Sequence, residues 1–199
     1  MKYIVKPAVT LLVTAVVTVA ALSVVEALTR EPIKEQKRKT QEAAMREVLP
    51  RATEYLEIDV EKTGSISAVY EGYYSSEALD DKILIGYVVQ LSPEGYSGNI
   101  DIVAGLYLGE NVIYGIRVLR HTETPGLGAR AVEEFFYSRF DGLPLVPLTV
   151  VRTSPGENEI QAITSATITT KAITDAVNEA IEWCLAQDWN TLDEEGGEE

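Results

Sequence analysis

Residues Pro7 to Val25 form a run without a charged side chain that is rich in Val, Ala and Leu. As a helix rising 1.5 Å per residue, this run extends about 28 Å, close to the thickness of the bilayer's hydrocarbon core. A cleaved secretory signal peptide is the rival interpretation, but its apolar core would be shorter. We therefore predict a single-pass transmembrane helix over residues 7–28, preceded by a short N-terminus over residues 1–6.

Basic residues lie on both sides of the predicted membrane helix, and more of them follow it than precede it. Lys2 and Lys6 precede the helix, while the following residues are Arg30, Lys34, Lys37, Arg38 and Lys39. Counted in this way, the positive-inside rule favours a C-terminal domain in the cytoplasm.

Small and hydroxylated residues recur on one face of the same helix, at Thr10, Thr14, Thr18 and Ala21. Each hydroxyl can bond to a carbonyl of its own helix one turn earlier. Small residues also allow another membrane helix to approach closely. The two interpretations are compatible, and the sequence leaves both open.

The composition limits what the rest of the chain can bind. The 199 residues include 17 basic and 31 acidic side chains, for a net charge of −14, which disfavours nucleic acid as a partner. Cys184 is the only cysteine, so an intrachain disulfide is impossible, and its place on an apolar helix stripe predicts a buried thiol. His121 is the only histidine, so we expect no metal site built from His and Cys.

The pattern after the membrane helix predicts an α+β protein with one mixed domain around an antiparallel sheet. A charged amphipathic helix should connect the membrane to the domain over residues 29–50, the domain should cover 51–187, and an acidic tail should follow over 188–199. The expected strands are 65–70, 82–91, 100–108, 112–119 and 145–151, with a hairpin turn at 109–111. A helix over 129–140 should bury Val132, Phe135, Phe136 and Phe140, and a last helix should run from 171 to about 186.

A cluster of hydroxyl residues over 164–170 comes directly before the last predicted helix. Unpaired backbone N–H groups and the helix dipole favour an anion at such a place, most often a phosphate. The alternative is that Thr169 or Thr170 acts only as the N-cap of the helix.

Two motifs resemble those of a known family. Thr164-Ser165-Ala166-Thr167 is similar to the S/T-G-A-T flavinylation motif of the FMN-binding subunits of Rnf and Na+-translocating quinone-reductase complexes. The resemblance implies that Thr167 carries FMN through a phosphoester bond, with Thr169, Thr170 and Lys171 following at the cofactor site. The family usually has Gly at the position of Ser165 and Asp at the position of Gln161.

The second motif is His121-Thr122-Glu123-Thr124-Pro125-Gly126-Leu127-Gly128, which resembles the H-x-E-T-P-G-L-G loop of RnfG-type proteins. The resemblance implies a place beside the flavin for Glu123, Thr124, Pro125, Gly126 and Leu127. A Pro-Gly turn suits the close approach of backbone to a flat ring, although by itself it indicates only a turn.

The resemblance as a whole implies an RnfG-like flavoprotein subunit with covalent FMN and without catalytic residues or a metal of its own. It would relay electrons in a membrane complex that couples ferredoxin and NAD+ chemistry to Na+ or H+ translocation. The implied partners are the other membrane subunits and a separate flavin transferase, and the domain would lie outside the cytoplasm, at the plasma membrane. The alternatives are the corresponding subunit of the Na+-translocating quinone reductase and an anchored extracytoplasmic binding module without redox activity.

Overall fold

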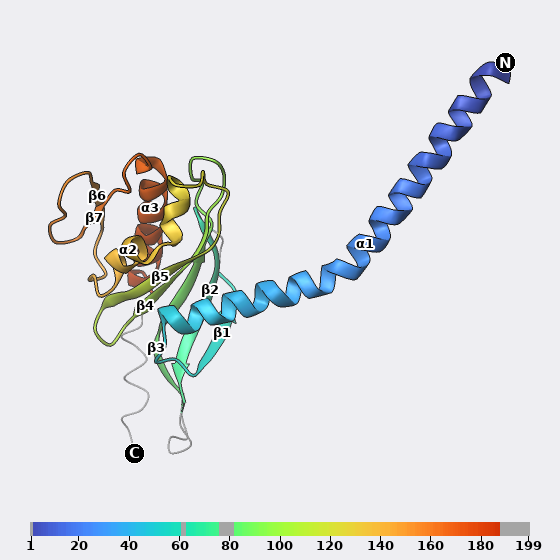
Figure 1. The fold of residues 1–199 in the computed structure, drawn as a ribbon. Helices are drawn as coiled ribbons and strands as arrows, with labels where there is room; N and C mark the ends of the chain where they lie inside the picture. Colours follow the sequence, from blue (N-terminus) through green and yellow to red (C-terminus); the bar gives the residue numbers. More distant parts are fainter. Residues whose placement is uncertain (1, 61–62, 76–81, 188–199) are drawn as a thin grey trace. The chain divides into compact units, whose positions relative to one another are not determined.

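A computed structural model describes residues 2–60, 63–75 and 82–187 of the chain (Figure 1). The predicted acidic tail lies outside the described residues. The chain divides into two units, Met1–Glu42 and Ala43–Glu199, of which the second holds the sheet and all later helices.

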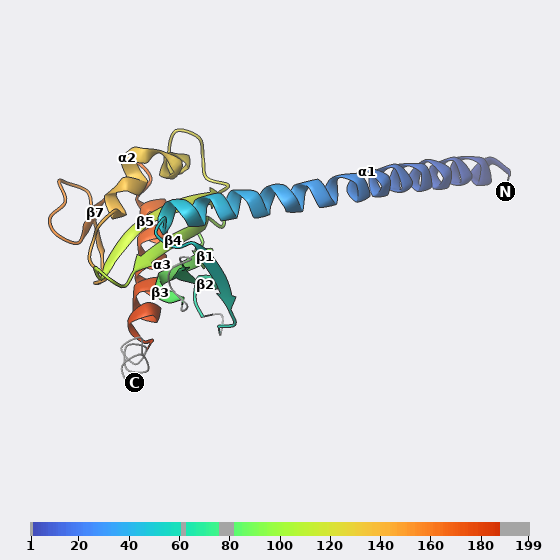
Figure 2. The same cartoon turned by 90° about the horizontal axis from the view of Figure 1, so that it is seen from below.

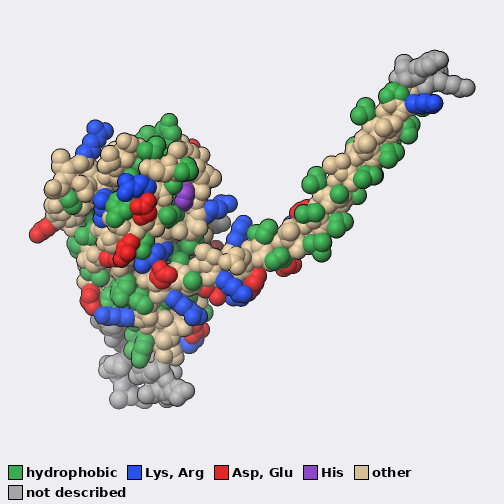
Figure 3. Space-filling model, viewed as in Figure 1, with side chains coloured by type: hydrophobic (Ala, Val, Ile, Leu, Met, Phe, Trp, Pro, Cys, Tyr) green, Lys and Arg blue, Asp and Glu red, His purple; other side chains and the backbone are tan. Residues whose placement is uncertain are grey.

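The first unit consists of most of helix α1 (Lys2–Val48), which runs without a break through the predicted membrane helix and through the predicted connector as far as Val48. Its most apolar 18-residue window has a mean hydropathy of 2.5 and is unburied, so α1 is a candidate membrane span. Figure 3 shows apolar side chains on both sides of this part of the helix. The hydroxyl of Thr10 donates to the carbonyl of Lys6 at 3.0 Å, and that of Thr18 to Thr14 at 2.8 Å, as expected for hydroxyls that bond back to their own helix.

The second unit is built on an antiparallel sheet, as predicted. Within the described residues its strands follow one another in chain order: β1 (Glu54–Ile58), β2 (Ile66–Tyr74), β3 (Ile83–Leu91), β4 (Asp101–Tyr107) and β5 (Val112–Arg120). The prediction missed β1, a short strand with two Glu residues, and ended β2 four residues early. Asn111 adopts a positive φ of 56° in the predicted turn between β4 and β5.

Both faces of the sheet are covered within this unit. Helix α3 (Thr167–Leu185) runs along one face, where Val89 and Ala104 join its buried residues in one apolar core (Figure 1 and Figure 2). The last turns of α1 cover the other face, where Val48 packs with Val88 and Val103. Consecutive residues within β3, and likewise within β4, therefore point into different cores, because side chains alternate between the two faces of a strand.

The segment after the 121–128 loop corrects the prediction of one helix over 129–140. It consists of η1 (Gly128–Val132), α2 (Glu134–Tyr137) and η2 (Ser138–Phe140), with Glu133 in an extended conformation between the first two. Phe136 and Phe140 are buried as expected and their rings pack edge to face at 5.7 Å. Val132 and Phe135 are instead 46% and 36% exposed, because the break at Glu133 turns them away from the core.

The predicted strand over 145–151 is shorter in the structure. Only β6 (Thr149–Val151) is a strand within that range, and it pairs in parallel with β7 (Glu159–Gln161). Pro147 removes a backbone donor from the segment before β6, which limits pairing there.

Candidate functional site

A cavity of about 400 Å³ lies at the start of α3. It brings together the two motifs singled out in the sequence, although Glu123 and Thr169 are 46 residues apart. Its lining includes the predicted residues Glu123, Thr124, Leu127, Ser165, Ala166, Thr167 and Thr169, and also Tyr96, Gly128 and Ile168. The other predicted site residues, Thr164, Pro125, Gly126, Thr170 and Lys171, lie outside this lining.

Helix α3 begins at Thr167, four residues earlier than predicted, with Ala166 as its N-cap. The proposed N-caps Thr169 and Thr170 therefore lie inside the helix, and that interpretation is wrong. The Thr170 hydroxyl accepts the backbone N–H of Ile163 at 3.0 Å and donates to the carbonyl of Ala166 at 3.1 Å. Among the described side chains none caps the N-terminus of α3, so its first N–H groups are available to an anion.

Ser165, just before the helix, has a φ of 65°. This left-handed conformation is adopted easily by glycine and at some cost by residues with a side chain. The backbone at this position explains why glycine suits the motif. Ser165 adopts this left-handed conformation, and Thr167, two residues later, is partly exposed in the cavity.

Glu123 connects the three segments that form the cavity. Its side chain is only 6% exposed, and its two oxygens have different partners. Oε2 accepts the hydroxyl of Thr169 at 2.6 Å, and Oε1 accepts the backbone N–H of Ser97 at 2.9 Å. Glu123 thus fixes the start of α3 and the 95–98 loop against its own loop, while still lining the cavity.

The close packing around this carboxylate requires a residue without a side chain at Gly128. A Cβ atom there would collide with Glu123 Oε2 and would lie 2.5 Å from the hydroxyl oxygen of Thr169. The last Gly of the second motif is therefore needed for the packing of the buried Glu123–Thr169 pair.

Tyr96 is one of three lining residues that the sequence analysis did not select, with Gly128 and Ile168. It is 71% exposed, in a turn closed by a hydrogen bond from Gly95 N–H to the carbonyl of Gly98 at 2.9 Å. Leu127 and Ile168, which also line the cavity, are 41% and 57% exposed. Exposed apolar side chains around a cavity with polar groups inside are typical of a site for a ligand with a flat apolar part. The turn glycines around Tyr96 were the sequence signal for this loop.

Cys184 is buried far along α3, as predicted, and burial raises the pKa of its thiol to about 12. No group of His, Cys, Asp and Glu residues suited to a metal ion occurs in the part of the chain that the structure describes. The residues that line the cavity supply hydroxyl, backbone, carboxylate and apolar groups.

Comparison with known proteins gives matches over both units. Residues 95–182 match the FMN-binding domain family, and residues 1–48 match the RnfG N-terminal region. The G subunit of the ion-translocating oxidoreductase complex of Methanosarcina acetivorans is 31% identical over 191 residues, covering 94% of this chain and 97% of that protein. The G subunit of the Na+-translocating ferredoxin:NAD+ oxidoreductase complex of Acetobacterium woodii is 34% identical over 197 residues, covering 91% of each chain.

Among solved structures, the C subunit of the Na+-translocating NADH-quinone reductase from Parabacteroides distasonis superimposes with a TM-score of 0.56. The match covers 78% of this chain and 97% of that one at 16% identity, so it shows a shared fold.

Proposed function

Because the chain belongs to the RnfG family of ion-translocating oxidoreductase complexes, we propose that it is a membrane-anchored flavoprotein subunit with FMN bound covalently to Thr167. Within its complex the protein relays electrons on their way between ferredoxin and NAD+. The complex couples this electron transfer to ion translocation. It has no small-molecule substrate of its own.

One observation carries this proposal: the cavity joins an uncapped helix N-terminus, a partly exposed threonine hydroxyl and exposed apolar side chains. The first-turn N–H groups of α3 and the helix dipole suit a phosphate ester at Thr167. Tyr96, Leu127 and Ile168 suit the faces of a flat ring system. The volume of about 400 Å³ lies within the range of cofactor sites.

When bound, FMN supplies the redox chemistry, and the protein residues hold and orient it. Glu123 keeps the start of α3 and the 95–98 loop in place through its bonds to Thr169 and Ser97. The Ser165 turn presents Thr167 at the cavity. Attachment through Thr167 leaves the ring system unmodified and prevents loss of the cofactor by diffusion.

The attachment itself needs a second protein, a flavin transferase that uses FAD. Thr167 Oγ would form a bond to the FMN phosphorus as the bond between the two FAD phosphates breaks. AMP leaves and the hydroxyl proton is released, so the exchange involves no oxidation or reduction. Glu123 is already bonded to Thr169 and Ser97, and we assign it no role as the base.

The attachment site is tested by Thr167→Ala in cells that also express the transferase. We expect intact-protein mass and in-gel flavin fluorescence to show loss of FMN in Thr167→Ala and retention in Thr153→Ala. Thr153 is the matched control because it is exposed and lies outside both motifs and the cavity lining. FMN that persists in Thr167→Ala would exclude this residue, and a colourless wild-type protein would favour the binding module without redox activity.

We also propose that the domain lies outside the cytoplasm, as the family resemblance implies and against the count of basic residues beside the membrane helix. A cysteine placed at Glu199 in a Cys184→Ser background should react with an impermeant thiol reagent on intact cells. Labelling only after lysis would place the domain in the cytoplasm. For the domain limits we propose an anchor over residues 7–28, a helical connector over 29–50 and the flavin domain over 51–187.

A further inference from the structure

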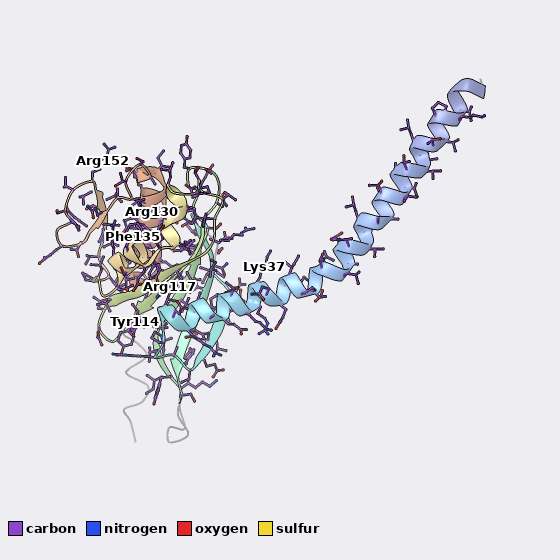
Figure 4. The ribbon with its side chains drawn as sticks, in the orientation of Figure 1. Lys37, Tyr114, Arg117, Arg130, Phe135 and Arg152 are labelled. Atoms are coloured by element: carbon purple, nitrogen blue, oxygen red, sulfur yellow. The ribbon has the colours of Figure 1, made fainter. Side chains whose placement is uncertain are left out.

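The segment η1–α2–η2, together with the residue that follows β6, forms a surface rich in arginine on an acidic chain. We call it the arginine–phenylalanine surface and define it as Arg130, Val132, Phe135, Arg139 and Arg152. Figure 4 shows Arg130, Phe135 and Arg152 on the same side of the domain.

The centre of this surface is the ring of Phe135, which is 36% exposed. The guanidinium carbon of Arg130 lies 4.5 Å from its centroid, and that of Arg139 lies 5.2 Å from it. Two guanidinium groups are thus held against one exposed aromatic ring, with Val132, 46% exposed, close by along the chain. Exposed Phe and Arg in this combination are typical of the energetic centre of a protein interface.

The surface continues to Arg152 through β6 and β7. Arg139 donates to the carbonyl of Gln161 in β7, which pairs with Val151 in β6, the residue before Arg152. Arg152 is exposed and, over the ranges that the structure describes, makes no ion pair.

Three arginines gather on this surface in a chain whose net charge is −14, and the exposed Glu133 and Glu134 lie beside them. Arg130 has a carboxylate neighbour, Glu133, at 3.4 Å, while Arg139 forms no ion pair with any of the described residues. Burial and the nearby Arg130 lower the pKa of Arg139, as expected where guanidinium groups lie close together. Planar guanidinium groups that pack on a ring are well suited to bidentate bonds with carboxylates.

The surface is also directly connected to the cavity. Gly128 lines the cavity and is the first residue of η1, and η1 contains Arg130 and Val132. A partner seated on the surface would therefore lie beside the flavin site.

We infer that the arginine–phenylalanine surface is the docking site for a carboxylate-rich surface of a neighbouring subunit in the same complex. This inference rests on the proposed function, because it names the partner that meets the flavin domain. A protein is favoured over an anionic membrane surface because Glu133 and Glu134 lie exposed among the arginines. A uniformly negative membrane would repel these carboxylates, whereas a protein surface can match an alternating pattern.

The test uses the full chain, expressed with the other subunits and the transferase and purified in mild detergent through a tag on this chain. Arg130→Glu/Arg152→Glu should lose the other subunits at a salt concentration at which the wild-type complex stays intact, with retention reduced at least about tenfold. Arg51→Glu/Arg120→Glu is the matched control, because it makes the same charge change at two other exposed arginines of the domain.

The covalent flavin, measured by intact mass, separates this inference from the proposed function. A wild-type chain without flavin or without partners would refute the proposed function. Equal retention by Arg130→Glu/Arg152→Glu and wild type, or an equal loss in the control, would refute the docking site alone. Phe135→Ala gives a second variant that leaves the charge unchanged and should also reduce retention.

Hydrogen exchange separates a protein partner from lipid. Peptides covering residues 128–140 should exchange more slowly in the complex than in the chain alone in nanodiscs. Equal protection of these peptides in anionic nanodiscs without other subunits would overturn the inference in favour of the membrane.

Discussion

Replacing Glu123 tests whether one buried carboxylate holds the cavity together. In Glu123→Ala the hydroxyl of Thr169 and the N–H of Ser97 both lose their acceptor. A hydrogen bond to a charged group contributes about 1.5–3 kcal/mol. Water from the adjoining cavity can compensate in part, so we expect Glu123→Ala to lower the free energy of unfolding by about 2–4 kcal/mol.

Glu123→Gln is the matched variant because it keeps the size and both possible bonds. The amide oxygen can accept from Ser97, and the amide nitrogen can donate to the Thr169 oxygen. Loss of charge assistance alone should lower the free energy of unfolding by about 1 kcal/mol. A double-mutant cycle of Glu123→Gln with Thr169→Val should give a coupling energy of about 0.5–3 kcal/mol, since the two side chains are in contact.

The assay is urea unfolding of the full chain in detergent, followed by the fluorescence of Trp183 in a Trp189→Phe background. Trp183 reports on the domain because its ring packs edge to face on Tyr87 at 5.2 Å. An alanine variant within about 0.5 kcal/mol of wild type would refute the reasoning. A glutamine variant as unstable as the alanine variant would also refute it, because the charge and not the bonding geometry would then dominate.

Three further predictions concern Ser165, Cys184 and the threonine face of α1. Ser165→Gly should raise the free energy of unfolding by about 0.5 kcal/mol, and Ser165→Val should lower it by more than about 1 kcal/mol, because φ is 65° there; equal midpoints of urea unfolding would contradict this. Cys184 should not react with a thiol reagent at pH 8 until the domain unfolds. Burial in the folded domain raises the pKa of the Cys184 thiol from 9.0 to about 12. The stabilisation from this raised pKa is therefore complete below pH 9 and is lost as the pH rises toward 12, which alkaline unfolding would measure. Thr14→Leu/Thr18→Leu should insert normally but co-purify less with the other subunits if this face packs on another helix, and full recovery of the complex would show that it faces lipid.

Much of the architecture could be predicted because it depends on local patterns. The uncharged run over 7–25 determines a helix able to span a membrane whatever the rest of the chain does, since length and hydropathy suffice. The apolar segments likewise predicted strands at β3, β4 and β5, and the turn at Asn111 predicted the antiparallel hairpin of β4 and β5. The two motifs identified the family and most of the cavity lining.

Other features depended on contacts between distant residues. The 129–140 segment has helical spacing, but a break at Glu133 buries Phe136 and exposes Phe135. The hydroxyl cluster suggested an N-cap. In the folded chain Thr169 is instead bonded to Glu123, 46 residues earlier, and Thr170 to the backbone of Ile163.

The sequence by itself therefore determined the anchor, the strand pattern and the identity of the two motifs. Only the tertiary structure decided which threonine hydroxyls of the cluster are buried and which is partly exposed in the cavity. It also decided that Tyr96 joins the cavity and that arginines gather around Phe135. The physical reason is that hydropathy and turn preferences act between near neighbours. The partner of a buried carboxylate, and the exposure of a side chain, are set by whichever segments the sheet and α3 bring into contact.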